Sequence, residues 1–260
     1  MNKPFVVPVN RDSACQPPSA KDFLVDRTFR GLARIGVVLI LALVAALVFE
    51  VGRKALPGME KHGFDVLFGS VWDVNQGKYG ILPAIWGTLY SAFIALLIAG
   101  FFGVSMAIFL TQDFLPAKLA AVFRTIVELL AAIPSVVYGL WGIYVVIPAI
   151  RPLTTWLNSE LGWIPFFGTS LSGPGLLPAA LVLAIMILPT IAAVSQDALT
   201  SVPMKTKQAA YGMGTTHWEA ILKVMVPSAA TGIFGSLVLG LGRALGETMA
   251  LAMLVGNANN

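Results

Sequence analysis

Long apolar runs separated by short polar segments dominate the pattern of this chain. The runs predict helices over roughly 32–51, 81–110, 119–149, 176–197 and 229–256. A helix that rises ~1.5 Å per residue needs ~20 apolar residues to cross the ~30 Å hydrocarbon core of a bilayer, and each run is long enough. The pattern therefore predicts an all-α, polytopic membrane protein with about five transmembrane helices.

The polar segments predict how these helices are oriented. Residues 1–31 contain four prolines and are expected to form a mobile tail. Residues 1–34, the turn near 111–124 and the segment 198–227 carry eleven Lys and Arg residues, against five in 52–79 and 150–175. Since cytoplasmic segments are enriched in Lys and Arg, the N-terminus and segment 198–227 are predicted to be cytoplasmic.

Composition narrows the class of protein. Hydrophobic residues make up 57% of the chain and charged residues 12%, which excludes an ordinary soluble domain. Cys15 is the only cysteine, so an internal disulfide framework is excluded, and the dispersed net charge of +4 argues against nucleic acid as a partner. The sequence has no phosphate-binding Gly-x-x-x-x-Gly-Lys-Ser/Thr motif and no Cys/His cluster with metal-ligand spacing. We expect a non-catalytic chain that holds no metal or cofactor, with His62 and His217 as loop or surface residues.

Segment 198–227 predicts two short helices joined by a glycine turn. Gly212 and Gly214 can take the positive φ that ends the first helix. The sequence Thr-His-Trp-Glu at 216–219 has the spacing of a capping box and predicts the start of the second helix. Pro227 is expected to end that helix before the next span.

This hairpin resembles the cytoplasmic coupling loop of ABC-importer permeases. The family pattern is Glu-Ala-Ala, three residues, Gly, nine residues, then an aliphatic residue, any residue, Leu and Pro. The residues that fall on it here are Gln208, Ala209, Ala210, Gly214, Val224, Val226 and Pro227, with Gln208 in place of Glu and Val226 in place of Leu. The resemblance implies a loop that docks into a groove of an ATP-hydrolysing subunit. An ordinary helical hairpin between spans is the alternative.

Proline and glycine mark two further positions inside the apolar runs. Pro134 is predicted to kink or break the third helix, and Ser135 could satisfy the freed backbone groups. Such a break can line a cavity, or it can be a simple packing kink. Gly240 and Gly242 lie in the last run, where small residues permit close helix packing.

Two charged residues lie in the same run. Arg243 and Glu247 are four residues apart, so they are predicted to share a helix face and to meet. If the span begins near Ala229, Arg243 lies roughly 21 Å in, which is past the midplane. Charges at that depth face a bundle interior or a water-filled cavity. They could bind a passing anion, or form a self-neutralising pair that only fastens helices together.

Together with Gly80–Leu89 and Glu128–Gly139, the segment Gly240–Thr248 resembles the PstC-type permease subunit of phosphate importers. The resemblance implies a type I ABC-importer permease fold in the bacterial inner membrane, surrounded by lipid. It also implies a sister permease subunit, a dimer of ATP-binding subunits that holds ATP and Mg, and a periplasmic phosphate-binding protein. Arg243 would then donate to inorganic phosphate, and Glu247 would hold the guanidinium. That family has a sixth span, so residues 257–260 are expected to be a truncated end.

Other functions stay open on the sequence. A permease for another oxyanion, such as sulfate or molybdate, would share most of these features. A different class is a regulatory membrane component that reports phosphate status through its partners without itself transporting. A proton-coupled secondary transporter could use Glu247 and would need no ATPase.

Overall fold

The computed structural model describes residues 20–63, 65–73, 78–112, 114–161, 163 and 173–255. The helices are α1 (Ala20–His62), α2 (Asp65–Phe68), α3 (Leu82–Thr111), α4 (Ala117–Ala132), α5 (Ser135–Trp141), α6 (Ile147–Leu161), α7 (Leu176–Thr200), α8 (Met204–Gly212), α9 (His217–Glu219), α10 (Val226–Ser228), α11 (Ala230–Gly246) and α12 (Met249–Val255). Two π-helical segments, Gly142–Val146 and Ala220–Met225, join α5 to α6 and α9 to α10. Strands β1 (Trp72–Asp73) and β2 (Lys78–Tyr79) form a two-stranded sheet.

The chain separates into two compact units. Residues 1–69 and 73–79 make up the first unit, and residues 70–72 and 80–260 make up the second. The predicted end at 257–260 and Cys15 both lie outside the described residues.

Helix α1 dominates the first unit and is longer than the predicted span of 32–51. Residues 20–31, expected in a mobile tail, form its first turns, and residues 52–62 continue it into the predicted external loop. Residues 20–31 contain no proline, and an Asp26–Arg30 ion pair of 2.7 Å at i,i+4 spacing supports the helix. Within the first unit, none of the most apolar stretch of α1 is buried.

Helix length and apolarity bear out the predicted class. Among the described residues, four helical stretches are long and apolar enough to cross a membrane: Phe23–Lys61, Leu82–Thr111, Ser135–Glu160 and Leu176–Thr200. The stretch 217–228 and α11, bent by 68°, would together make a fifth. The prediction of an all-α polytopic protein with about five such helices is confirmed.

The third and fifth predicted spans are each broken in the structure. The range 119–149 contains α4 and α5, separated by extended backbone at Ile133 and Pro134. Beyond the break the helical path continues to Leu161, into the predicted external segment. The range 229–256 contains α11 and α12, separated at Glu247, whose backbone is extended (φ −77°, ψ 119°).

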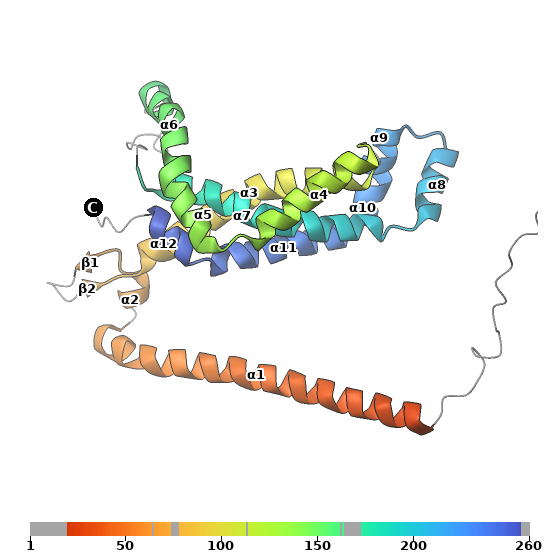
Figure 1. The fold of residues 1–260 in the computed structure, drawn as a ribbon. Coiled ribbons are helices and arrows are strands. Elements are labelled where there is room, and N and C mark those ends of the chain that lie inside the picture. Colours follow the sequence, from red (N-terminus) through yellow and green to blue (C-terminus); the bar gives the residue numbers. More distant parts are fainter. Residues whose placement is uncertain are drawn as a thin grey trace, which may run out of the picture. The chain divides into compact units, whose positions relative to one another are not determined.

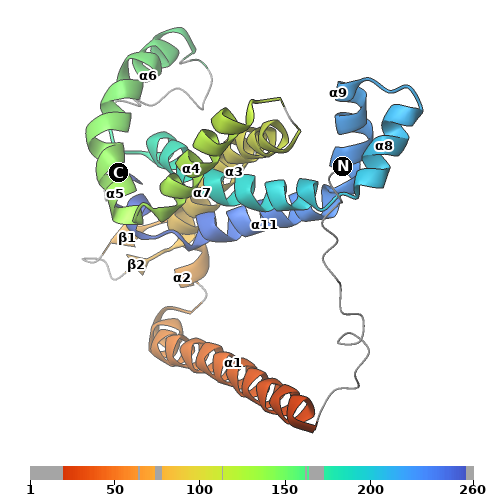
Figure 2. The same ribbon diagram turned by 45° about the vertical axis from the view of Figure 1, so that its right-hand side comes forward.

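Helix α7 lies at the centre of the second unit and packs against α3 and α11 (Figure 1). Its buried Ile187 and Ile191 belong to one core with Ala92, Ala95 and Ala99 of α3. The three alanines recur at helical spacing, so they form a narrow stripe that lets the two backbones approach closely. The hairpin α8–α9 projects at one end of this bundle, and α5, α6 and α12 lie at the other (Figures 1 and 2).

Small residues at every fourth position bring α11 against α7. A Cβ added at Gly232 would clash with Ala198 Cβ, and one at Gly240 would lie 2.7 Å from Ile191 Cγ1. Between them, the buried hydroxyls of Ser236 and Ser195 share a 2.7 Å hydrogen bond. The close packing predicted for Gly240 is therefore present, whereas a Cβ at Gly242 would meet nothing within 4 Å.

Candidate functional site

The first helix of the hairpin, α8, ends in a turn that depends on one glycine. Gly214 has φ +81° and follows Met213, the last residue with helical backbone hydrogen bonding. The amide of Thr215 donates to the Ala210 carbonyl (3.4 Å), and that of Gly214 donates to Tyr211 (3.0 Å). This pair of bonds is the Schellman arrangement, which requires a left-handed residue at the position of Gly214. Gly212, predicted to share this role, instead lies in α8.

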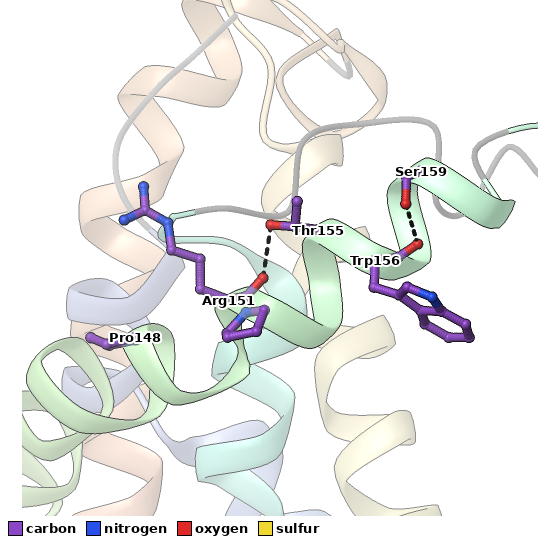
Figure 3. A pocket seen from close by; sticks show the side chains of 6 residues that line it. Pro148, Arg151, Thr155, Trp156 and Ser159 are labelled. Atoms are coloured by element: carbon purple, nitrogen blue, oxygen red, sulfur yellow. Dashed lines mark hydrogen bonds between the residues drawn. The ribbon is translucent and has the colours of Figure 1, made fainter.

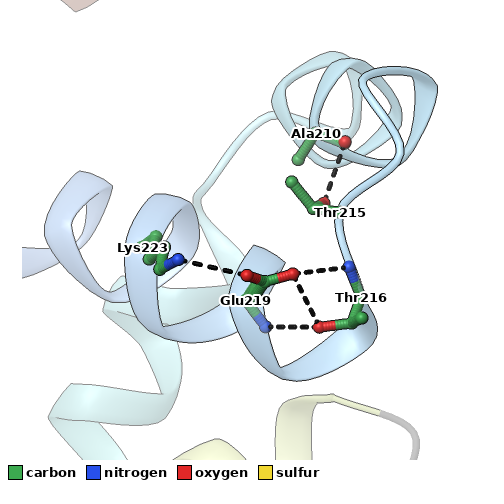
Figure 4. Close-up of polar contacts among 5 residues, drawn as sticks. All are labelled: Ala210, Thr215, Thr216, Glu219 and Lys223. Carbon is green, nitrogen blue, oxygen red and sulfur yellow. Dashed lines mark hydrogen bonds and ion pairs between the residues drawn. The ribbon is translucent and has the colours of Figure 1, made fainter.

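The second helix begins at the predicted capping box (Figure 4). Thr216 Oγ1 accepts from the Glu219 amide (3.3 Å), and Glu219 Oε2 accepts from the Thr216 amide (3.1 Å). Lys223 Nζ lies 3.1 Å from Glu219 Oε1. The Thr216 amide, followed by the bonds from Lys223 and the Thr216 hydroxyl, lowers the pKa of Glu219 to about 2. The carboxylate therefore stays ionised at physiological pH, and the cap persists.

The residues that match the coupling-loop pattern divide between the surface and the interior of the hairpin. Gln208 and Ala209 are exposed on α8, where another protein can reach them. Ala210 is only 3% exposed, and its carbonyl accepts from the Thr215 hydroxyl at 2.9 Å. Ala210 thus packs within the hairpin, whereas Ala209 lies on its outer surface.

Pro227 lies inside α10, two residues before the sharp bend at Ala229. Helix 217–228 and α11 meet there at 68°. Because proline lacks an amide proton and crowds the preceding turn, the backbone before it widens into the π-helical segment 220–225. The predicted end of the second helix is therefore present as a bend that redirects the chain into α11.

The hairpin also contacts the turn between α3 and α4. His217 Nε2 lies 3.2 Å from the Gln112 carbonyl, and its Nδ1 lies 2.8 Å from the Tyr211 hydroxyl. Phe114 packs on both His217 and Trp218, with ring centroids 5.0 and 4.9 Å apart. The sequence predicted only that His217 is a loop or surface residue. No local pattern identifies its contact with Gln112, which is 105 positions away.

The helix break at Pro134 is stabilised by a residue that the sequence did not single out. Proline has no amide proton to donate to the Leu130 carbonyl four residues earlier. That carbonyl accepts from the Ile133 amide (3.3 Å) and from the hydroxyl of Tyr138 in α5, which reaches back across the break (2.9 Å). Ser135, predicted to satisfy such a group, begins α5, and its hydroxyl makes no hydrogen bond within the part of the chain that the structure describes. Tyr138 thus makes the bond predicted for Ser135.

Arg243 and Glu247 lie at the second break but do not form the predicted pair. None of the ion pairs within the described residues joins them, because α11 ends between them. Glu247 Oε1 instead accepts from the Ala250 amide (3.1 Å) and caps α12. Arg243 Nη1 donates to Thr190 Oγ1 of α7 at 2.8 Å, so the side chain that contacts the guanidinium is Thr190 and not Glu247.

Arg243 is the charged residue of α11. Its side chain is exposed on the surface of this chain, within an otherwise apolar helix. Guanidinium has five N–H donors, and the hydrogen bond recorded for it among the described residues uses one of them. The sequence gives one hint of Thr190, because it is a polar residue directly after Pro189 inside an apolar span.

The two breaks are connected by close packing of α5 on α12. A Cβ added at Gly139 would lie 2.9 Å from Met253 Sδ, and one at Gly142 would lie 2.6 Å from Leu254 Cδ2. Each of these helices begins immediately after a break. Two interrupted helices therefore meet at the end of the bundle opposite the hairpin. Broken helices inside membranes are tolerated where they face protein or line a cavity.

A surface hollow lies on α6 (Figure 3). It has a volume of about 520 Å³ and is lined by Pro148, Arg151, Pro152, Thr155, Trp156 and Ser159. All six residues come from one helix, and Arg151 and Trp156 point in different directions. A hollow formed by a single helix is open to its surroundings and does not make an enclosed binding site. In the described part of the chain, no cluster of three His, Cys, Asp or Glu could hold a metal.

Comparison with known proteins agrees with this architecture. Residues 99–259 match the family model described as the binding-protein-dependent transport system inner membrane component. The phosphate transport system permease protein PstC of Pasteurella multocida is 41% identical over 240 residues, covering 90% of this chain and 75% of its own length. The protein of the same name from Haemophilus influenzae is 40% identical over 242 residues, covering 90% and 76%.

The chain belongs to the PstC family of binding-protein-dependent permeases. A third PstC protein, from Xylella fastidiosa, is 38% identical over 246 residues, covering 92% of this chain and 75% of its own length. Membership of the PstC family identifies the chain as a multi-pass membrane subunit. Permeases of this family are not themselves the catalytic subunits.

Proposed function

We propose that this chain is one permease subunit of an ATP-driven importer of inorganic phosphate. Its PstC relatives carry the name of a phosphate transport system, which supports the substrate class. The proposal rests mainly on Arg243, whose planar guanidinium lies in an apolar helix. Its Nη1 donates to Thr190 Oγ1 at 2.8 Å, which orients the group. Arginine binds phosphate through two parallel N–H donors, a geometry that lysine cannot reproduce.

The translocation path would run along the exposed side of α11 that carries Arg243. A sister permease subunit would complete it, since one chain leaves the arginine on an open surface. A buried charge needs a partner, so the anion itself would compensate Arg243 during passage. Glu247 would act indirectly, by capping α12 and so shaping the second break.

Energy would come from separate ATP-binding subunits that bind ATP and Mg and dock on the hairpin. Exposed Gln208 and Ala209 offer a helix surface for that contact, and the hairpin lies at one end of the bundle (Figure 2). The hairpin would then be cytoplasmic, as would the N-terminus, in the bacterial inner membrane. A phosphate-binding protein would deliver the anion at the opposite end.

Complementation tests this proposal in a bacterium that lacks its PstC-type permease but retains the other subunits. Expression of this chain should restore high-affinity uptake of radiolabelled phosphate. Excess arsenate, which resembles phosphate in shape and charge, should compete, whereas sulfate and molybdate should not. Strong competition by sulfate or molybdate would indicate a permease for another oxyanion. Restored phosphate-dependent signalling without uptake would indicate a non-transporting role.

A further inference from the structure

We infer that His217 is a positioning residue that couples the ATPase-facing hairpin to the transmembrane bundle through the α3–α4 turn. This inference rests on the proposed function, and it specifies how movement of the hairpin would reach the path. It assigns a role to a residue outside the coupling-loop pattern. The contacts of His217 on both sides carry the argument.

On the hairpin side, His217 is bound to α8. The Tyr211 hydroxyl lies 2.8 Å from Nδ1, and the two rings are stacked, with centroids 6.1 Å apart and planes within 4°. Tyr211 follows Ala209 and Ala210 in the same short helix. Any displacement of the exposed surface of α8 therefore moves His217 with it.

On the bundle side, His217 is bound to the end of α3. Its Nε2 lies 3.2 Å from the carbonyl oxygen of Gln112, a residue that is only 2% exposed. The last carbonyls of a helix have no partner within that helix, and His217 supplies a donor for this one. Phe114 makes a T-shaped contact with the imidazole and so adds an apolar contact to the polar one.

The two bonds determine the tautomer of His217. A carbonyl can only accept, so Nε2 must carry the proton that is donated to Gln112. In the neutral ring Nδ1 is then an acceptor, and the Tyr211 hydroxyl donates to it. The result is a directional chain of hydrogen bonds from α8, through one imidazole, to the end of α3.

This connection matters because the chain bends at both ends of the hairpin, and a bend transmits movement less directly than a straight helix. One end leaves α7 through the short segment 201–203, and the other joins α11 at the 68° bend. Helix α3, by contrast, packs along α7 through its stripe of alanines. Val226 of the hairpin also packs against the cluster that holds Ala107 of α3 and Leu199 of α7. His217 adds a directional polar link to this apolar contact, so that the hairpin and the α3–α7 pair move together.

Two substitutions separate the two bonds of His217. His217→Gln places an amide nitrogen near the position of Nε2, so it keeps a donor for the Gln112 carbonyl. His217→Asn places its amide near Nδ1, so it keeps a partner for Tyr211 but loses the bond to α3. Both variants carry a carboxamide side chain, and they differ only by one methylene group in length.

The test measures transport per ATP hydrolysed in proteoliposomes that contain the chain with its partner subunits and the binding protein. ADP formation is measured rather than phosphate release, because phosphate is also the substrate. We expect His217→Gln to keep phosphate uptake per ADP within about twofold of the parent, and His217→Asn to lower it at least about fivefold. In both variants, co-purification of the ATP-binding subunit and basal ADP formation should match the parent.

A parental ratio of uptake to ADP in His217→Asn would overturn the inference. Loss of assembly in that variant would also overturn it, because His217 would then be needed for folding rather than for coupling. Absence of ATP-dependent phosphate uptake by the parent complex is a different result, since it would contradict the proposed function itself.

Discussion

Replacing Arg243 with Gln is expected to lower phosphate uptake by at least about tenfold while the complex still assembles. A hydrogen bond to a charged group contributes about 1.5–3 kcal/mol, which corresponds to roughly ten- to hundredfold in affinity or rate. Gln keeps a polar side chain, although a shorter one, and removes the charge and the paired donors. Arg243→Lys should restore only part of the uptake, because it keeps the charge and loses the paired donors.

Two further variants sharpen this test. Thr190→Val removes the hydroxyl 2.8 Å from Arg243 and should lower uptake by only a few fold, because the guanidinium stays but is less well oriented. Arg53→Gln is the control, since Arg53 forms an exposed pair with Glu50 on α1. If Arg243→Gln assembles normally and transports at the parental rate, Arg243 is a structural residue and the anion site is misassigned.

Ala209→Glu is expected to abolish docking of the ATP-binding subunit without unfolding the hairpin. Ala209 is exposed on α8, so a glutamate there is solvated in the free chain. In a close protein interface it would be a buried, unpaired charge, which costs several kcal/mol. Co-purification of a tagged ATP-binding subunit measures the loss.

The controls for this prediction distinguish docking from folding. Ser159→Glu adds the same charge at an exposed position of α6, at the opposite end of the bundle, and should leave co-purification unchanged. Gly214→Val should also weaken docking, but by disrupting the turn, since valine strongly disfavours φ +81°. Full recovery of the ATP-binding subunit with Ala209→Glu would show that α8 is not the contact surface.

Local sequence chemistry predicted the hairpin in detail. The Schellman turn at Gly214 and the capping box at Thr216 each depend on residues within a few positions of one another. Such patterns are specific because backbone groups at helix ends must find partners nearby. The apolar runs likewise predicted the class of protein, because the bilayer requires a minimum length of apolar helix.

Contacts across the fold could not be predicted in the same way. Pro134 marked the position of the third-helix break, but the side chain that stabilises it, Tyr138, lies beyond the kink. Glu247 continued the helical spacing from Arg243, although Gly246 before it is a residue that often ends a helix. Beyond the break, α12 packs against α5, where a Cβ at Gly139 would lie 2.9 Å from Met253 Sδ. The link from His217 to Gln112 also depends on how distant helices meet.

Uptake of radiolabelled phosphate into proteoliposomes tests the central claim most directly. The chain is reconstituted with a sister permease, the ATP-binding subunits and the binding protein, with ATP at the face of the ATP-binding subunits. We expect phosphate accumulation that requires both ATP and this chain, and that continues when the proton gradient is collapsed. Accumulation without ATP, driven by the proton gradient, would contradict the account, as would equal accumulation when this chain is left out.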